Sequence, residues 1–308
     1  MPRNTRVSVT SATIDVKSDG GTAATLLARC TFPPTGTAVT CAISGGADST
    51  ALLVLAVEAG LEVTAVHVDH GLREGSADEA EIVRENALRL SATFRSERVH
   101  LLDGPNLEAR AREARYAVLP SDVLTGHTAD DQAETVLVNL LRGASTSGLA
   151  AMRPGHQHPI LGLRRSETVE LCAALQLPLV HDPSNLEPRH LRNRVRHELL
   201  PLMAQLSQRD LAPVLARQAA LARDDDELLN TLASALDPTD ARALAAAPVA
   251  LARRAVRQWL GGTHPPDAAT VERVLQVARG HSLATEVGSG RRVERHLQRL
   301  SLGPDEQA

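Results

Sequence analysis

The chain has 308 residues, of which 43% are hydrophobic, so it can bury the core of one large domain or of two ordinary ones. A formal net charge of −4 and an aromatic content of 1% disfavour a protein that binds RNA through an overall basic surface or by stacking many bases on aromatic rings. No apolar run approaches the ~20 residues of a membrane span, residues 1–21 contain no signal-peptide segment, and the three cysteines form no C-x-x-C pair. We therefore expect a cytoplasmic protein with reduced thiols and no membrane partner.

The first elements along the chain are an apolar run at residues 38–43 and a helical run at residues 50–58. Between them stands the sequence Ser44-Gly45-Gly46-Ala47-Asp48-Ser49. The order of strand, glycine turn and helix N-terminus points free backbone N–H groups and the helix dipole at one spot, which suits a phosphate group. Asp48 would repel a phosphate unless a Mg²⁺ ion lay between them. We therefore predict that residues 44–49 bind phosphate and that Asp48 binds a metal ion.

This turn is not the commoner phosphate loop with the pattern G-x-x-x-x-G-K-S/T, because the only lysine of the chain is Lys17. The pattern S-G-G-x-D-S is similar to the loop of enzymes that split ATP into AMP and pyrophosphate. An ordinary glycine turn at a strand–helix junction is the alternative interpretation. We expect ATP and Mg²⁺ as the cofactors of this turn.

The elements that follow alternate between strand and helix. Strands are predicted at residues 61–69, 92–99 and 122–126, and helices at residues 76–90, 107–119 and 130–142. This alternation indicates an α/β fold, with a parallel sheet covered by helices on both faces. Ligands of such sheets bind at the carboxyl ends of the strands. The segments 44–49, 67–73 and 126–131 should therefore meet at one edge and form one active site.

Changes in composition and periodicity along the chain predict an N-terminal extension and two domains. Residues 1–35 read as a polar N-terminal extension, partly disordered, and residues 36–205 as the ATP-binding catalytic domain. Residues 206–308 read as a second, mostly helical domain, with helices expected at 214–229, 241–260 and 268–278. Within residues 206–308, an alternation of apolar and polar residues that would fit a strand is found only in about the last thirty residues.

A second group of polar residues lies at 126–135, after the strand predicted at 122–126. If the chain is helical from Asp130, then Asp131 and Glu134 lie on one face of the helix, with His127 just before it. Clustered carboxylates suit a metal ion or an ammonium group. Alternatively, the acidic residues only complement the dipole of the helix N-terminus.

A third group contains Asp182-Pro183-Ser184-Asn185 and the arginines that follow. Arg192 and Arg196 are one helical turn apart, whereas Arg194 points elsewhere. An arginine-rich turn is typical of a contact with phosphate or RNA. The alternatives are a solvated helix face, or structural ion pairs with Asp182 or Glu198.

Taken together, the three groups resemble the tRNA(Ile)-lysidine synthetases, a family of PP-loop ATP pyrophosphatases. The resemblance covers about residues 37–201 and includes His70-Gly71-Leu72-Arg73, Glu108 to Tyr116, Arg142-Gly143 and Gly148-Leu149. Two positions depart from the family pattern. Thr128 stands where a second histidine is often found, so we expect no role that depends on two imidazoles, and Gly143-Ala144-Ser145 loosens a glycine-serine-glycine turn. The length fits the compact form, without the further C-terminal domain of long members.

The resemblance implies a two-step reaction at the wobble cytidine of tRNA(Ile) with a CAU anticodon. ATP adenylates the base at O2 and releases pyrophosphate, and free L-lysine then attacks C2 and displaces AMP. The resemblance implies the partners tRNA(Ile) and lysine and leaves the oligomeric state open, a homodimer being one alternative. We expect residues 206–308 to contact the tRNA. A tRNA-thiolating enzyme with the same loop, and a non-catalytic ATP-binding protein, are the rival functions.

The resemblance also implies roles for particular residues. Asp48 binds the metal, and Asp131 and Glu134 hold the ammonium group of lysine. His127 lies near the adenylate, and Arg112 neutralises phosphate charge that develops in the reaction. The expected contacts with the RNA backbone are Arg192, Arg194 and Arg196.

Overall fold

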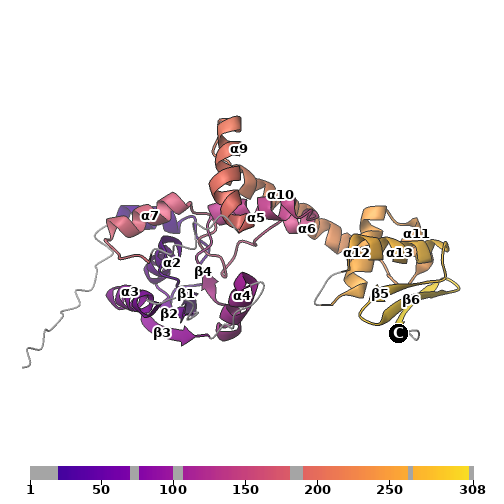
Figure 1. The fold of residues 1–308 in the computed structure, drawn as a ribbon, viewed down its shortest axis with the longest axis horizontal. Helices are drawn as coiled ribbons and strands as arrows, with labels where there is room; N and C mark the ends of the chain where they lie inside the picture. Colours follow the sequence, from indigo (N-terminus) through magenta and orange to yellow (C-terminus); the bar gives the residue numbers. More distant parts are fainter. Residues whose placement is uncertain (1–19, 70–75, 100–106, 181–189, 263–265, 305–308) are drawn as a thin grey trace, which may run out of the picture. The chain divides into compact units, whose positions relative to one another are not determined.

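A computed structural model of the chain describes residues 20–69, 76–99, 107–180, 190–262 and 266–304 (Figure 1). The motifs expected at 70–73 and 182–185 lie outside the described residues. The chain divides into two units, Met1–Ala219 and Ala220–Ala308. Within the described ranges, no helix is both long and apolar enough to cross a membrane.

The first unit is built on a four-stranded parallel sheet. Its strands are β1 (Ala38–Ala42), β2 (Glu62–Asp69), β3 (Thr93–Arg98) and β4 (Leu124–Thr125). They lie in the order β3-β2-β1-β4, so β1 pairs with β2 on one side and with β4 on the other. The prediction of an α/β fold with a parallel sheet is confirmed.

The strand order places a ligand site at one edge of this sheet. From β1 the chain winds outward through β2 to β3, and it then returns to add β4 on the opposite side of β1. Neighbouring loops therefore leave the carboxyl ends of β1 and β4 in opposite directions, and this is where open α/β sheets bind ligands. Ala42 pairs with Thr125 at this edge, so the turn at 44–49 and the segment after Thr125 start side by side.

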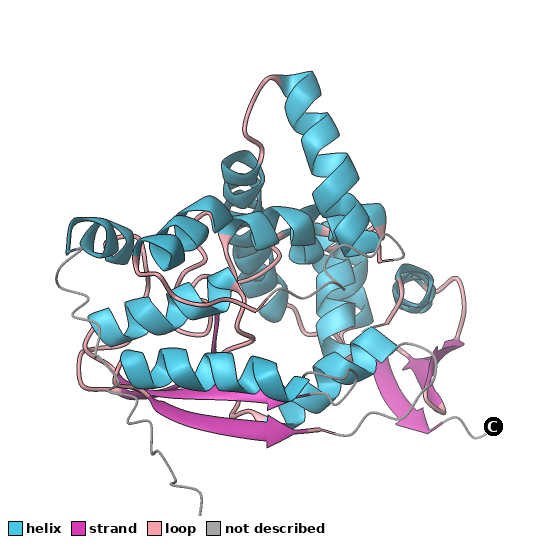
Figure 2. Cartoon of the chain, turned by 60° about the vertical axis from the view of Figure 1, so that its left-hand side comes forward, coloured by secondary structure: helices cyan, strands magenta, loops and turns pink. Residues whose placement is uncertain are grey.

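Helices cover the sheet. The main ones are α1 (Gly20–Leu27), α2 (Ala47–Glu58), α3 (Ser76–Arg89), α4 (Leu107–Val118), α5 (Ala129–Leu141) and α7 (Arg165–Ala174). Side chains alternate across the pleat, so Cys41 and Ala65 enter the larger core with α1, α2, α3 and α7. Val66 faces the other way and packs with Leu119 and Val123. Figure 2 shows the parallel strands in magenta, lying along the helices in cyan.

The end of the first unit carries short helical segments. They are α6 (Thr146–Leu149), α8 (Leu191–Arg194), the π-helical turn η3 (Val195–Leu199) and α9 (Leu200–Ser207). In η3 the N–H of Leu200 donates to the carbonyl of Val195, five residues earlier. Pro201 follows at the start of α9 and has no N–H to continue the ordinary ladder, which accounts for the widened turn. Helix α10 (Ala212–Ser234) then runs from the first unit into the second.

The second unit combines helices with a small antiparallel sheet. Its helices α11 (Ala241–Ala246), α12 (Val249–Leu260) and α13 (Ala268–Arg279) pack on β5 (Ala284–Gly288), β6 (Arg291–His296) and β7 (Arg299–Pro304). The single helix expected at 241–260 is two helices, because Pro248 forces Ala247 into an extended conformation and caps α12. The sheet occupies residues 284–304, the part of the predicted second domain where the sequence shows strand-like alternation.

Candidate active site

The turn at 44–49 joins β1 to the N-terminus of α2. Gly45 has φ +87°, and a Cβ there would lie 2.4 Å from Val180 Cγ2, so this position requires glycine. Gly46 is the N-cap of α2, and no side chain caps the helix. The first-turn N–H groups of α2 therefore face the space above the turn without a capping side chain, which makes an anion site.

The two serines of the turn hold its shape. The Ser44 N–H donates to Ser49 Oγ at 3.2 Å, and Ser49 Oγ donates to the Gly46 carbonyl at 3.0 Å. The Oγ atoms of Ser44 and Ser49 lie 3.1 Å apart. The hydroxyls thus fasten the two ends of the turn to each other.

Gly126 brings β4 against the start of α2. A Cβ on Gly126 would lie 2.7 Å from the Asp48 carbonyl oxygen and 2.9 Å from Ser49 Cα, so any larger residue would push the two elements apart. This close approach sets the residues that follow β4 beside the phosphate turn. The predicted meeting of the two segments is therefore confirmed by the geometry.

Helix α5 begins at Ala129 and not at Asp130. The backbone N–H and the hydroxyl of its N-cap, Thr128, both donate to Asp131 Oδ2 at 2.9 Å. Asp130 turns away to Arg164, whose Nε and Nη2 donate to its two carboxylate oxygens at 3.0 and 2.9 Å. Helix capping therefore accounts for the contacts of Asp131 Oδ2. It does not involve Asp131 Oδ1 or the Glu134 carboxylate, which contact Arg165.

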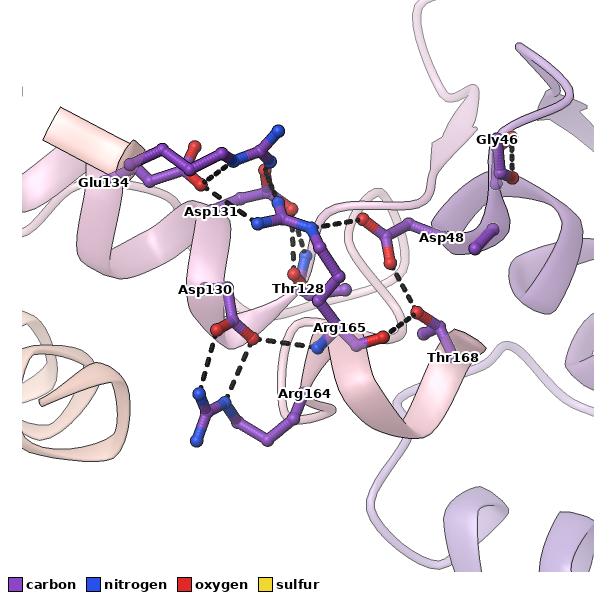
Figure 3. A network of polar contacts seen from close by, with 12 residues as sticks. Gly46, Asp48, Thr128, Asp130, Asp131, Glu134, Arg164, Arg165 and Thr168 are labelled. Carbon is purple, nitrogen blue, oxygen red and sulfur yellow. Dashed lines mark hydrogen bonds and ion pairs between the residues drawn. The ribbon is translucent and has the colours of Figure 1, made fainter. Parts of the chain in front are cut away.

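Arg165, the first residue of α7, joins three predicted site carboxylates (Figure 3). Its Nε donates to Asp48 Oδ2 at 3.1 Å, its Nη2 to Asp131 Oδ1 at 2.9 Å and its Nη1 to Glu134 Oε1 at 3.1 Å. Sequence reasoning missed Arg165, whose only signal is a pair of arginines after the apolar residues Ile160, Leu161 and Leu163. We call Arg165, Arg192 and Arg196 with Asp48, Asp131 and Glu134 the arginine–carboxylate network.

Arg192 and Arg196 complete this network from α8 and η3. Arg192 donates to Glu134 Oε2 at 2.8 Å and to Asp131 Oδ1 at 3.0 Å, and Arg196 Nε donates to Glu134 Oε1 at 2.6 Å. Glu134, 1% exposed, thus binds three guanidinium groups. Arg194 lies apart from the network and pairs with Glu198 on an exposed face.

The charges in the network affect its acids differently. Burial raises the pKa of Asp48, and the hydrogen bond from Thr168 and the charge of Arg165 offset this only in part. Burial also opposes ionisation of Asp131, but the charges of Arg165 and Arg192 outweigh it and lower the pKa of Asp131. The network therefore keeps an ionised, largely buried carboxylate at the place where the sequence predicts an ammonium site.

His127 follows β4 and contacts a second imidazole. Its Nδ1 lies 2.8 Å from Thr125 Oγ1 and 3.3 Å from Nδ1 of His158, and the two ring centroids are 5.0 Å apart, edge to face. A distant turn thus places a second imidazole beside His127, although Thr128 occupies the position next to it in the sequence. Arg112 lies in α4, but its side chain falls outside what the structure describes.

The described side chains include no group of three or more His, Cys, Asp or Glu that could hold a metal ion unaided. A single carboxylate at the phosphate turn suits Mg²⁺, which takes most of its other ligands from substrate phosphates and water. The thiols of Cys30, Cys41 and Cys172 do not fit a nucleophile, because burial raises the pKa of each to about 12.

Comparison with known proteins agrees with this geometry. Residues 22–203 match the PP-loop domain family, so fold and turn together define a PP-loop ATP-binding protein. The tRNA(Ile)-lysidine synthase of Nocardia farcinica is 44% identical over 255 residues, covering 77% of this chain and 80% of its own. The enzyme of the same name from Mycobacterium tuberculosis strain H37Rv is 39% identical over 277 residues, covering 82% and 85%. The chain belongs to the tRNA(Ile)-lysidine synthase family, whose members are tRNA-modifying, ATP-dependent ligases that form a carbon–nitrogen bond.

A solved structure shares the fold at low identity. The U34-tRNA thiolase NcsA from Methanococcus maripaludis, solved with its 4Fe–4S cluster, superposes with a TM-score of 0.54 and 17% identity, covering 68% of this chain and 81% of that one. At this identity the likeness concerns the fold alone.

Proposed function

We propose that the chain converts the wobble cytidine of tRNA(Ile) to lysidine at the edge formed by β1 and β4. The observation that carries the proposal is the convergence there of an uncapped phosphate turn with Asp48, Asp131 and Glu134. ATP would transfer its adenylyl group to O2 of the cytidine, with loss of pyrophosphate. The amine of free L-lysine would then give up a proton and attack C2, and the C2–O bond would break with its electron pair leaving on AMP.

The turn supports the first step. The uncapped N–H groups of α2 and the hydroxyls of Ser44 and Ser49 would bind the pyrophosphate portion of ATP. Asp48 would hold Mg²⁺, which supplies positive charge to the phosphates when bound. In the structure Arg165 is the cation beside Asp48, so Arg165 would have to shift when the metal binds. Arg112 remains the proposed partner of the reacting phosphate.

The network supports the second step. Asp131 and Glu134 would bind the ammonium group of lysine, for which the arginines substitute in the structure. Arg192 and Arg196 would exchange these carboxylates for phosphates of the tRNA backbone, and Arg194 would add a contact from its exposed face. Under this proposal the exchange makes room for lysine when tRNA is bound.

Pyrophosphate release tests the proposal. It should be low with ATP alone, rise with tRNA(Ile) and be followed by AMP release and lysidine formation when lysine is added. Turnover that requires a sulfur donor instead of lysine would favour the thiolation alternative, which the buried thiols disfavour. Tight ATP binding without any pyrophosphate release would favour a non-catalytic protein. A homodimer stays a separate prediction, which the mass of the protein in solution would test.

A further inference from the structure

The turn at 155–158 is fastened to the end of β4. The backbone N–H and the hydroxyl of Thr125 contact the Gln157 carbonyl at 2.9 and 3.0 Å, and Gln157 Nε2 donates to the Ser121 carbonyl at 2.6 Å. The His158 N–H donates to the Gly155 carbonyl at 3.0 Å and closes the turn. The backbone thereby holds the His158 ring at one place, beside His127.

Thr125 Oγ1 has three polar partners in this arrangement. They are the Gln157 carbonyl at 3.0 Å, His127 Nδ1 at 2.8 Å and His158 Nδ1 at 2.8 Å. A carbonyl oxygen can only accept, so the single hydroxyl proton of Thr125 goes to Gln157. The two remaining lone pairs of Oγ1 then accept a proton from each Nδ1. Both imidazoles therefore carry a proton on Nδ1, and any proton that they gain or lose is at Nε2.

We infer that His158 is a positioning residue for His127, acting through Thr125. The two Nδ1–H groups share one acceptor, and the edge-to-face contact restrains the His127 ring, so the direction of Nε2 of His127 and the tautomer of its neutral ring are fixed. His127 is close enough to Asp131 for its charge to help lower the pKa of that carboxyl, which places the ring beside the proposed lysine site. The functional part of this inference rests on the proposed function, whereas the proton positions do not.

Nitrogen-15 NMR of the histidine-labelled protein tests the proton positions without any turnover. The chain has 12 histidines, and the spectra of His127→Gln and His158→Gln assign the two signals. We expect Nδ1 of both rings to be protonated in the neutral form. In Thr125→Val we expect the neutral rings to populate the Nε2-protonated tautomer as well. A neutral His127 ring protonated at Nε2 and not at Nδ1 in the unmodified protein would overturn the inference.

A matched pair of variants tests the role in the reaction. The side-chain amide of His158→Asn places an N–H close to the position of Nδ1, whereas that of His158→Gln reaches the position of Nε2. We expect His158→Asn to stay within about threefold of the parent and His158→Gln to lose about 10-fold in kcat, as for one lost hydrogen bond, with the KM for lysine unchanged. Equal loss in both variants, or activity kept only by His158→Gln, would exclude positioning through Nδ1.

A double variant separates a shared role from two independent ones. If His158 acts through Thr125, the double variant Thr125→Val/His158→Gln should have nearly the same kcat as Thr125→Val alone. Additive losses would contradict the inference. Thermal unfolding of His158→Asn and His158→Gln should agree, so that a difference in kcat reports on positioning. If the parent protein makes no lysidine but its rings carry the Nδ1 protons, the proposed function fails and the proton assignment stands.

Discussion

The two units of the molecule each bury an arginine–carboxylate contact, but the contacts differ in number and place. In the second unit Arg254 Nη1 donates to Asp226 Oδ1 at 2.5 Å and to Asn230 Oδ1 at 2.9 Å, with side chains 15% and 12% exposed for Arg254 and Asp226. These contacts join α12 to α10. In the first unit three cations and three anions from five segments meet beside the phosphate turn.

The difference shows that burial of charge alone does not mark a functional site. A buried ion pair seldom stabilises a fold more than apolar residues of the same volume, so neither contact is explained by stability alone. The pair in the second unit, together with Asn230, joins two helices. The network in the first unit gathers several carboxylates at the ligand-binding edge of the sheet, where substrate cations can replace the arginines. The predictions below test this distinction.

The largest effect should come from Asp48→Asn in the first unit. It removes the charge proposed to hold Mg²⁺ and keeps the size of the side chain, so pyrophosphate release should fall at least about 100-fold. The matched variant Asp226→Asn in the second unit should keep pyrophosphate release and lower the free energy of unfolding by about 1.5–3 kcal/mol. Near-parental release by Asp48→Asn would remove the distinction between the two units.

The next effect concerns lysine and separates two neighbouring acids of α5. Glu134→Gln or Asp131→Asn removes a charged partner of the ammonium group, worth about 1.5–3 kcal/mol, so the KM for lysine should rise about 10- to 150-fold. Asp130→Asn is the comparison variant, because the Asp130 carboxylate binds the guanidinium group of Arg164 and, within the network, the backbone N–H of Arg165 instead of its side chain. If all three variants keep the parental KM, the acids of α5 serve only the helix and its packing.

A smaller effect should appear in tRNA binding. Arg192→Ala and Arg196→Ala should each reduce the slope of log K against log salt by up to about 1, since each would lose one phosphate contact. Arg84→Ala is the control, because Arg84 pairs with Glu81 on an exposed face of α3, away from the network. An unchanged slope with a lower melting temperature would make these arginines structural, like Arg254. The RNA surface would then be sought in the second unit around Arg253 and Arg257, since their neighbour Arg254 is held by Asp226.

The smallest effect is a change in melting temperature, which should have opposite signs in Asp48→Asn and Asp131→Asn. Burial raises the pKa of Asp48, so its charge weakens the fold at neutral pH, and stability is regained as the pH falls through the folded pKa. For Asp131, burial is outweighed by Arg165 and Arg192, so its lowered pKa adds stability above the unfolded pKa, which is lost as the pH falls through the folded pKa. Near pH 7, Asp48→Asn should therefore raise the melting temperature slightly and Asp131→Asn should lower it. The same sign for both would contradict this assignment.

The sequence by itself determined the local features of this protein. The phosphate turn depends on glycines next to a strand and a helix, and the shared face of Asp131 and Glu134 follows from the period of one helix. The alternation of strands and helices likewise predicted the parallel sheet and the edge where its loops meet. The turn and the helix face depend on neighbours a few residues apart, and the sheet follows from the order of strands and helices along the chain, so both can be predicted without knowing which distant side chains meet.

Only the tertiary structure decided which distant side chains meet at that edge. Arg165 lies 117 residues beyond its partner Asp48, and His158 lies 31 residues beyond His127. Arg192 and Arg196 read as RNA contacts in the sequence, but they bind the carboxylates of α5 in the fold. Periodicity says which face of a helix is polar, but not which charge from another element packs against it. That choice depends on the strand order, on the close approach at Gly126 and on the cost of leaving a buried charge without a partner.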